Sequence, residues 1–506
     1  MRSIYSVCAG LAFFLATLLL LITVGCGSDP SGVTPTQHPL VAQYNVSIGG
    51  AAQVWVEFGP DRNYGRQTQR YSTTGAGTDT LHILVAGMSP SSLYHMRAHA
   101  QWSNGKTWVD QDHAFRTGPI PPSLTAPTIT VSRPSASLSP APGVELLSTN
   151  GSLEAVVADL KGNIVWYCPG FALPLKPLAN GHFIFNRRTD LQEVDLACNT
   201  IRDVSVTQVN QSLQSNGYDF TVAQGPNLPS GSPFHHDVLV LPNGHWIVLC
   251  EIEKSFTDLP GYPGIMNVGG DGVLDIAPNG NVAWAWSAFD HLDVNRHLMG
   301  LPDWTHSNAL VYTPDGNLLV SMRAQSWILK LDYANGTGSG SVLWKLGNGG
   351  DFILEGQDSS QWFYAQHYPN LLETNGSQMM LAVFDNGNFR IDSQGAACGT
   401  TTSAPACYSR AAIFQVDENT RLASLLWKDQ PGFFSFWGGN IGILSNGDVE
   451  FDSSEPFFPS NPNASQILEV THTDNPQTVW QMTISGENAY RGYRIPSLYP
   501  GVTWTQ

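Results

Sequence analysis

From about residue 143 to the C-terminus, short apolar segments alternate with polar turns that end in glycine. The turns recur at 149–151, 179–181, 242–244, 278–280, 314–316, 374–376 and 445–447, mostly as Asn-Gly or Asp-Gly. Segments that end in an apolar residue and tryptophan recur between them, as NIVWYC, NVAWAW, SVLWKLG, ASLLWKD and QTVWQM. Each unit therefore predicts four strands, the last of which ends near a tryptophan. Strand units of this kind favour a β-propeller over a sandwich.

The repeat divides into six units. Five are continuous, at 174–205, 233–287, 305–347, 366–428 and 436–484. The sixth combines YRGYRIPSLYP near the C-terminus with VELLSTNGSLEAVVADLKGNIVWYC near residue 144. Pairing the last strand with the first unit closes the ring and removes exposed sheet edges. We therefore predict an all-β chain in which residues 143–506 form a six-bladed β-propeller.

Residues 40–118 predict a second, smaller β domain. Alternating segments such as AAQVWVEFG, LHILVAGM and YHMRAHAQW are separated by turn-rich pieces. The module resembles a fibronectin type III sandwich, with Tyr94 where that family has its corner tyrosine. A Pro-rich linker is expected over 119–142.

The N-terminus predicts an exported protein. Arg2 precedes a mostly apolar stretch, Leu11 to Val24, which has the form of a signal peptide over residues 1–25. The segment Thr23-Val24-Gly25-Cys26 resembles a bacterial lipobox, so Cys26 is a candidate for lipidation; an ordinary cleaved signal peptide is the alternative. Residues 26–39 are expected to be a flexible tether. These features predict a periplasmic or outer-membrane lipoprotein that meets the membrane only through its lipid.

Composition excludes some partners and supports export. The net charge of −17 argues against binding to a nucleic-acid backbone. Cys398 and Cys407 flank a polar loop and predict a disulfide, and Cys168 with Cys198 is a further option. Cys250 lies inside an apolar strand and is expected to be an inert thiol. No cysteine or histidine spacing predicts a metal site.

Histidines recur at equivalent places in three units. His235, His306 and His367 each stand nine or ten residues before the turn glycine of their unit. Equivalent residues of a repeat occupy equivalent places in space, so three imidazoles are expected at one mouth of the central channel. Because neighbouring strand residues face opposite sides, only one of His235 and His236 can point inward. The match of His235-His236-Asp237 with His306-Ser307-Asn308 favours His235.

Arginines add positive charge to the same region. Arg323 follows His306 on the next strand, in an apolar run where it needs an anion or a carboxylate. Arg491 and Arg494 open the inner strand of the ring-closing unit, as substrate contacts or as caps of the ring. Asn308 is a candidate substrate-binding residue, and with Asp237 a candidate to orient an imidazole.

The segments DWTHSNALVYTPDGNLLVSMRAQ, WFYAQHYPNLL with VFDNGNFR, and HHDVLVLPNG together resemble the bacterial arylsulfate sulfotransferases, over roughly residues 143–500. The resemblance implies an exported six-bladed propeller that moves a sulfuryl group from a phenolic sulfate to another phenol. It implies a ping-pong reaction through a sulfated histidine, without the nucleotide donor PAPS and without a cofactor or metal. By motif, His367 is the nucleophile, and His306, Arg323 and one histidine of the HHD segment complete the site.

The chemistry is consistent with these residue types. Sulfuryl transfer resembles phosphoryl transfer, with charge spread over the non-bridging oxygens. A neutral imidazole is a competent nucleophile, and an arginine with a further imidazole can hold the oxygens. Two other classes stay open: a non-catalytic binding propeller at the cell surface, and a different propeller enzyme such as a lyase or oxidoreductase.

Overall fold

The computed structural model describes residues 31–505, apart from 171, 188, 392–394, 396, 399–406 and 456–463. The expected signal peptide and Cys26 lie outside the described residues. The chain is all-β, as predicted, with one α-helix in its described part, α1 (Val206–Ser215), and four short 3-10 helices. The 3-10 helices are η1 (Ala288–Asp290), η2 (Arg323–Gln325), η3 (Ala334–Gly336) and η4 (Ser359–Gln361).

Two antiparallel sheets form the N-terminal module. The first has the order β1-β2-β6, from β1 (Ser31–Pro35), β2 (Ala42–Gly49) and β6 (Thr78–Val85). The second contains β3 (Ala52–Gly59), β4 (Arg66–Gln67), β5 (Tyr71–Ser72), β7 (Leu93–Trp102), β8 (Thr107–Val109) and β9 (His113–Arg116). Alternate residues of β2 and β3 are buried in one shared core. The Tyr94 hydroxyl accepts the Ser89 amide at 2.9 Å, as a corner tyrosine would. The likeness to fibronectin type III stays a prediction.

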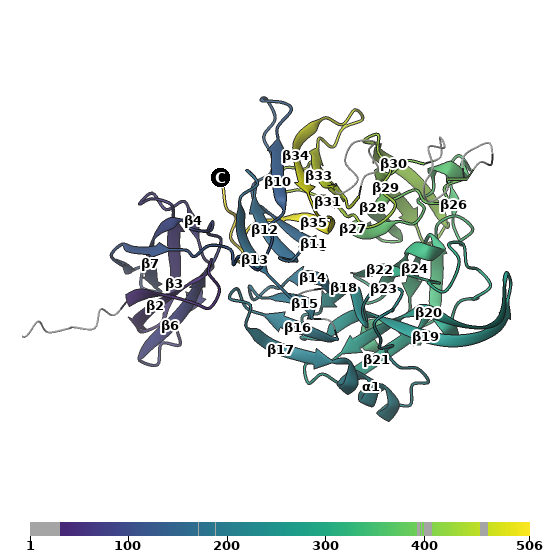
Figure 1. The fold of residues 1–506 in the computed structure, drawn as a ribbon, viewed down its shortest axis with the longest axis horizontal. Coiled ribbons are helices and arrows are strands. Elements are labelled where there is room, and N and C mark those ends of the chain that lie inside the picture. Colours follow the sequence, from purple (N-terminus) through teal and green to yellow (C-terminus); the bar gives the residue numbers. More distant parts are fainter. Residues whose placement is uncertain are drawn as a thin grey trace, which may run out of the picture.

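Six further sheets account for all the other strands of the described chain, and Figure 1 shows them around a common centre. In order, they contain β11 (Val144–Thr149), β12 (Ala155–Asp159), β13 (Ile164–Cys168) and β35 (Ala489–Ile495); β14 (Ala172–Pro177), β15 (Phe183–Arg187), β16 (Asp190–Val194) and β17 (Thr200–Ser205); β18 (Phe234–Val240), β19 (Trp246–Leu259), β20 (Tyr262–Ile276) and β21 (Val282–Ser287); β22 (Ser307–Tyr312), β23 (Leu318–Met322), β24 (Trp327–Leu331) and β25 (Val342–Leu346); β26 (Ile353–Leu354), β27 (His367–Asn375), β28 (Gln378–Asp385), β29 (Arg410–Asp417) and β30 (Leu422–Asp429); and β10 (Thr128–Ser132), β31 (Ile441–Ile443), β32 (Val449–Ser453), β33 (Ala464–Val470) and β34 (Thr478–Ser485).

The innermost strands contact one another from sheet to sheet. Contacts join β14 to β18, β18 to β22, β22 to β27 and β27 to β31, and β32, the second strand of the last sheet, contacts β35. The Tyr493 hydroxyl on β35 donates to the Leu175 carbonyl on β14 at 2.9 Å. The sequence of contacts therefore returns to the sheet with which it began.

The recurrent tryptophans explain how neighbouring sheets are held together. Each lies on the outermost strand of the four-stranded repeat, and its indole N–H donates to the last turn of the next sheet. The pairs are Trp166 to the Leu196 carbonyl, Trp286 to the Gly340 carbonyl, Trp344 to the Glu418 carboxylate, Trp427 to the Thr473 carbonyl and Trp480 to the Leu160 carbonyl. On the second sheet Arg202 takes this place, donating to the Gly244 and Ala277 carbonyls of the third.

Two strands lie where the sequence predicted irregular chain. The expected tether contains β1, which pairs with β2 from Ser31 opposite Val46 to Pro35 opposite Ala42. The expected linker contains β10, which extends the last sheet by pairing with β34. β1 is short and pairs with the next strand, whereas β10 pairs with a strand near the other end of the chain, which local periodicity cannot reveal.

Candidate active site

The three predicted histidine positions converge at the starts of three inner strands. His236 lies near the start of β18, His306 immediately precedes β22, and His367 is the first residue of β27. The ring centroids of His236 and His306 are 4.8 Å apart. Tyr490 on β35 lies 5.3 Å from His236 and 5.8 Å from His367 between ring centroids. One cluster of aromatic side chains therefore joins four sheets.

The histidine that joins this cluster is His236 and not His235, the one that the motif match favoured. The pairing of β18 with β19 shifts register between Phe234 and Val238, and His236 has a φ of 56°. This bulge breaks the simple alternation of strand faces. His235 turns away, and its Nε2 lies 3.2 Å from the Asp271 Oδ1. Both rings are buried.

The hydrogen bonds of Asn386 fix the tautomer of His367. The Asn386 amide nitrogen donates to the Ser435 carbonyl at 2.8 Å and the Gly438 carbonyl at 3.0 Å. Its oxygen therefore faces the His367 Nδ1 at 2.7 Å and must accept a proton from it. The His367 Nε2 accepts the Gly438 amide at 3.2 Å, which requires a lone pair on that nitrogen. The ring presents an unprotonated Nε2 on the side of Gly438.

The environment of His367 also keeps the ring neutral. Burial, and next to it the positive charge of Arg323, lowers the pKa of His367 well below its usual value of 6.5. The ring is therefore unprotonated at neutral pH, as a nucleophile must be.

His306 is held by a different kind of partner. Its Nδ1 lies 2.6 Å from the Asp303 Oδ2. A carboxylate on one ring nitrogen stabilises the imidazolium that forms when the other nitrogen takes a proton, a role familiar in general acid–base catalysis. His306 is therefore suited to proton transfer.

Arg323 lacks the carboxylate that its apolar setting would demand. One guanidinium nitrogen donates to the Phe436 carbonyl at 2.9 Å and another contacts the Met299 sulfur at 3.8 Å. The buried Nε has no hydrogen-bond partner, and no carboxylate in the described part of the chain lies within ion-pair distance of Arg323. A guanidinium with free donors is suited to an anion.

The other predicted polar residues divide into two groups. Arg491 is buried beside the cluster, where it donates to the Asn308 carbonyl at 3.0 Å and lies over the Tyr490 and Tyr368 rings. The Asn308 amide nitrogen donates to the Gln366 carbonyl at 2.7 Å, and its buried oxygen has no hydrogen-bond partner among the described residues. Asn308 therefore contacts Gln366, the residue before His367, and makes no hydrogen bond to an imidazole of the described residues.

Arg494 lies in a group of carboxylates. Its guanidinium is paired with Glu145, Glu450 and Glu469 on three other strands, and it donates to the Ala141 carbonyl at 2.7 Å. These carboxylates satisfy its charge and link β35 to β11, β32 and β33. The Asp237 Oδ1 likewise forms an ion pair with the Lys176 Nζ at 3.0 Å, and Asp237 makes no hydrogen bond to an imidazole of the described residues.

Three contributors were missed from the sequence: Asp303, Asn386 and Tyr490. Asp303 stands three residues before His306, and Asn386 follows a buried strand in the FDNG segment. Asn386 directly follows β28 and Asp303 lies in the loop before β22, and such positions often carry functional side chains. Tyr490 precedes Arg491 in the ring-closing strand, and nothing local distinguishes it from a core tyrosine.

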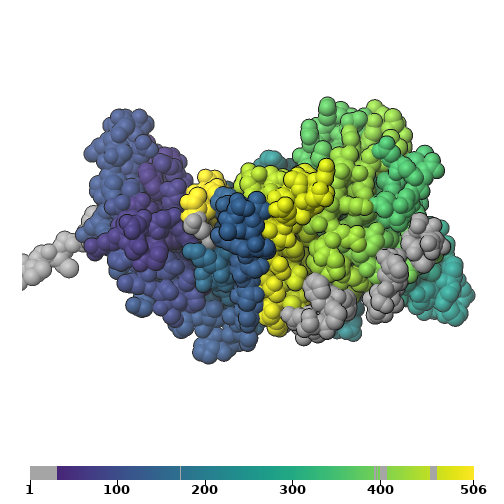
Figure 2. Space-filling view, turned by 90° about the horizontal axis from the view of Figure 1, so that it is seen from above, coloured from purple at the N-terminus to yellow at the C-terminus, as the bar shows by residue number. Residues whose placement is uncertain are grey.

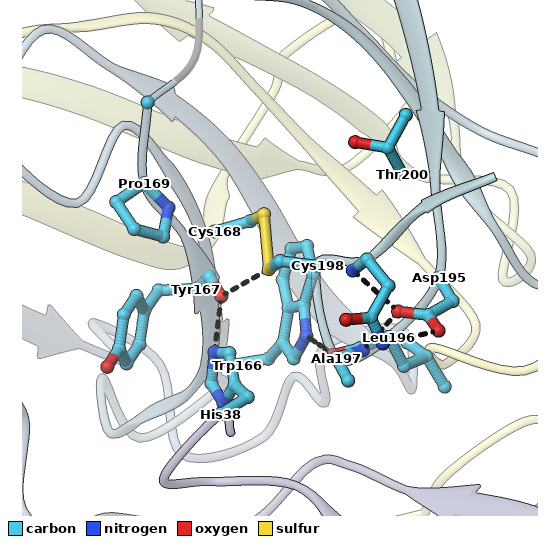
Figure 3. Close-up of a disulfide and its surroundings, with 12 residues drawn as sticks. His38, Trp166, Tyr167, Cys168, Pro169, Asp195, Leu196, Ala197, Cys198 and Thr200 are labelled. Atoms are coloured by element: carbon cyan, nitrogen blue, oxygen red, sulfur yellow. Dashed lines mark hydrogen bonds between the residues drawn. A yellow bond between two sulfur atoms is a disulfide. The ribbon is translucent and has the colours of Figure 1, made fainter. Parts of the chain in front are cut away.

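Both anticipated disulfides are present. Cys398 pairs with Cys407, and Cys168 on β13 pairs with Cys198 in the turn between β16 and β17. Figure 3 shows the second bridge beside Tyr167, whose carbonyl accepts a hydrogen bond from His38 at 2.8 Å. Cys250 is a buried free thiol, as predicted. Two disulfides indicate an oxidising compartment outside the cytosol.

Two other observations bear on ligands and location. Among the described residues, one group has ligand atoms close enough for a metal ion: His235, Glu251 and Asp271, within 4.8 Å of one another. None of the helices in the described ranges has the length and apolar character needed to cross a bilayer.

Several solved structures are distantly similar to this chain. A protein from Lactobacillus plantarum matches with 12% identity and a TM-score of 0.36, over 68% of this chain and 83% of that one. A streptogramin B lyase matches with 9% identity and a TM-score of 0.29, over 71% and 98%. A virginiamycin B lyase from Staphylococcus aureus matches with 10% identity and a TM-score of 0.27, over 71% and 99%. No conclusion rests on these likenesses.

Comparison with known sequences is more specific. No curated protein matches the chain. The family model described as arylsulfotransferase (ASST) matches residues 127–494, which include His236, His306, Arg323, His367 and Tyr490. The match covers most of the chain, and the chain belongs to the arylsulfotransferase family.

Proposed function

We propose that this protein transfers a sulfuryl group from a phenolic sulfate ester to a phenolic acceptor, without PAPS, through a sulfated His367. The observation that carries the proposal is the state of His367: neutral, with its proton on Nδ1 and its lone pair on Nε2. Family membership supports aryl sulfate transfer in general.

The fold proposal is a six-bladed propeller. The six sheets, their inner-strand contacts and the ring of tryptophan and arginine links support it. In that arrangement the site lies at one mouth of the central channel, where the inner strands begin.

In the first half-reaction, the Gly438 amide releases the His367 Nε2, and the lone pair that is freed attacks the sulfur of the aryl sulfate. An N–S bond forms and the bond from sulfur to the aryl oxygen breaks in line with it. The electron pair leaves with the phenolate oxygen. Arg323 stabilises the charge on the non-bridging oxygens through its free donors.

His306, backed by Asp303, supplies a proton to the departing phenolate. In the second half-reaction the same ring removes the proton of the acceptor phenol, whose oxygen attacks sulfur and breaks the N–S bond. Phenols need modest assistance because their pKa is near 10. Dividing the transfer at a covalent intermediate replaces one difficult step by two easier ones.

The test uses 4-nitrophenyl sulfate as donor and phenol as acceptor, with purified mature protein. We expect release of 4-nitrophenolate that depends on phenol. Without acceptor, intact-mass measurement should show one added sulfuryl group. His367→Ala should abolish both signals and keep the fold, whereas His82→Ala, an exposed histidine of the N-terminal module, should change neither. Absence of release from folded wild-type protein, across several aryl sulfates and acceptors, would contradict the proposal and favour a binding propeller.

We also propose that the protein is exported to the periplasmic side and anchored by lipid at Cys26. The lipobox-like segment supports this, and the disulfides agree with export. Cys26→Ser should move the protein from the membrane to the soluble fraction. If wild-type protein is already soluble after export, the anchor is absent and the signal peptide is simply cleaved.

A further inference from the structure

A buried group of one histidine and two carboxylates lies behind the site histidines. His235 comes from β18, Glu251 from β19 and Asp271 from β20, and all three side chains are at most 2% exposed. One ligand atom of each lies within 4.8 Å of the others. Three adjacent strands therefore bring an imidazole and two carboxylates, which are common metal ligands, to one place in the interior.

The two carboxylates occupy positions that their charges oppose. Glu251 and Asp271 stand directly opposite each other in the antiparallel pairing of β19 with β20, so both side chains leave the sheet on the same face. Like charges at opposed positions destabilise a strand pair, and burial adds to the cost. No lysine or arginine in the described ranges forms an ion pair with either carboxylate. A cation is therefore needed between them, either a metal ion or a protonated His235.

His235 makes no hydrogen bond to these carboxylates. Its Nε2 lies 3.2 Å from the Asp271 Oδ1, yet this buried atom has no hydrogen-bond partner in the described part of the chain. At the other end of the same two strands, the His245 Nδ1 lies 2.7 Å from the Asp275 Oδ1 in an ordinary hydrogen bond. A buried nitrogen without a hydrogen bond requires another partner, and its lone pair can bind a metal.

We propose that His235, Glu251 and Asp271 bind one zinc ion. Two atoms that each lie about 2.1 Å from a tetrahedral zinc ion are roughly 3.4 Å apart, close to the 3.2 Å between the His235 Nε2 and the Asp271 Oδ1. The two carboxylates balance the charge of the ion, and a water completes its four ligands. Calcium and magnesium prefer six or more oxygen ligands and do not suit a buried set that contains an imidazole.

Neighbouring groups hold both carboxylates in place. The Glu251 Oε2 accepts the Ser230 amide at 3.1 Å, and the Ser230 hydroxyl also donates to it. The Asp271 Oδ2 accepts the Ser307 amide at 2.6 Å, while its Oδ1 faces His235. Hydrogen bonds of this kind orient the ligands of metal sites.

The position of the group gives the ion a structural role. His235 directly precedes His236, and Ser307, whose amide Asp271 accepts, directly follows His306. A zinc ion bound here fixes the backbone beside two residues of the active site without contacting the substrate. The inference therefore does not depend on sulfuryl transfer.

The test measures zinc in the full mature protein by elemental analysis, after purification without a metal-binding tag. We expect about one zinc ion per chain in wild type. Glu251→Gln keeps an oxygen for the hydrogen bonds from Ser230 and removes the carboxylate charge and one ligand. Its zinc content should fall at least about tenfold.

Asp275→Asn is the matched control. Asp275 is as buried as Asp271, lies on the same strand and faces His245, but no third ligand from the described residues joins that pair. Its zinc content should equal that of wild type. Wild-type protein without zinc would overturn the proposal, and so would equal zinc in all three proteins, which would indicate an adventitious ion only.

The X-ray absorption spectrum of zinc in wild-type protein keeps the test valid even if Glu251→Gln does not fold. We expect one imidazole nitrogen and oxygen ligands at about 2.0–2.2 Å, and no sulfur. A sulfur ligand would place the ion on Cys250, the buried free thiol next to Glu251, and would overturn the proposal. A spectrum without an imidazole ligand would overturn it as well.

Discussion

At the scale of single residues, the site histidines differ in the partner that holds each ring. His367 is held by a neutral amide, His306 by a carboxylate and His236 by another imidazole. The amide leaves its ring neutral, whereas a carboxylate or a second imidazole can exchange a proton with the ring that it contacts. Three identical side chains are thus given three chemical characters by their neighbours.

Substitutions of Arg323 test whether the site needs a guanidinium or only a positive charge. Lysine at this position keeps a positive charge but lacks the buried Nε–H and the planar fork. We expect Arg323→Lys to lower kcat/KM by about 10²-fold and Arg323→Met, which lacks the charge, by more. Initial rates with 4-nitrophenyl sulfate measure both. Wild-type activity in Arg323→Lys would show that only charge is needed, and wild-type activity in Arg323→Met would exclude Arg323 from the site.

The depressed pKa of His367 also predicts how stability depends on pH. The unfolded chain binds a proton at this ring below its ordinary pKa of about 6.5, whereas the folded chain does so only at much lower pH. The stability that the neutral ring contributes is therefore complete above pH 6.5 and is lost as pH falls toward the folded pKa.

We expect His367→Gln to lose less free energy of unfolding than wild type between pH 7 and pH 5, by up to about 2 kcal/mol. Urea titrations at the two pH values measure the difference, because contributions from other groups cancel in the comparison. His82→Gln, at an exposed position, should behave as wild type. Identical pH dependence in His367→Gln and wild type would mean that His367 is not held neutral.

At the scale of elements, the segment between β30 and β31 brings the parts of the site together. Its Phe436 carbonyl accepts from Arg323, and its Gly438 contacts both His367 and Asn386. Gly438 has a φ of 66°, and a Cβ there would lie 1.9 Å from the Ser454 Oγ. This position therefore requires glycine for both conformation and space.

Gly438→Ala should therefore move the segment and lower activity. Gly432→Ala in the same segment is the matched control, because Gly432 also has a positive φ, of 84°, but no atom lies within 4 Å of an added Cβ. Both variants carry a conformational cost of about 1 kcal/mol. We expect kcat/KM to fall at least about tenfold in Gly438→Ala alone, since one misplaced contact of ~1.4 kcal/mol is tenfold in rate. Equal activities in the two variants would show that this segment does not position the site.

Element by element, the sequence predicted what is periodic and missed what depends on distant partners. The histidine positions and the tryptophan-ended strands follow from the repeat, and the tryptophans prove to bond each sheet to the next. A bulge in β18 shifts the register, so that His236 and not His235 joins the cluster. A prediction from strict alternation of strand faces cannot include such a shift. The carboxylates that pair with Arg494 come from three strands far from it in sequence, so the sequence does not show that they meet it.

At the scale of the whole molecule, the C-terminal residues join the N-terminal module to the ring of sheets. After β35 the chain runs to the module, and Figure 2 shows yellow C-terminal residues against the purple N-terminal ones. The Tyr499 hydroxyl accepts the Ala86 amide at 2.8 Å and donates to the Leu84 carbonyl at 3.0 Å. The Trp504 indole donates to the Gln67 carbonyl at 3.0 Å. The module is therefore held to the ring at two places along this tail.

Trp504 is the larger of the two anchors. It is almost fully buried, its ring lies 5.9 Å from that of Phe58, and the Arg66 guanidinium lies 5.0 Å above it. Gly87 packs so closely that a Cβ there would lie 2.2 Å from the indole. Removing such a side chain costs about 3–5 kcal/mol, most of which should fall on the joint between the module and the ring.

We therefore expect Trp504→Ala to separate one unfolding transition into two, with the module melting first, and to expose the segment 119–142 to protease. Activity toward 4-nitrophenyl sulfate should persist below the first transition, because the partners of Trp504 all belong to the module or the tail and none to the histidine cluster. Thr503→Ala, at the exposed neighbouring position, should keep a single transition. If Trp504→Ala unfolds in one step and loses activity together with structure, the module and the ring form one cooperative unit, and the N-terminal module is then part of what keeps the site assembled.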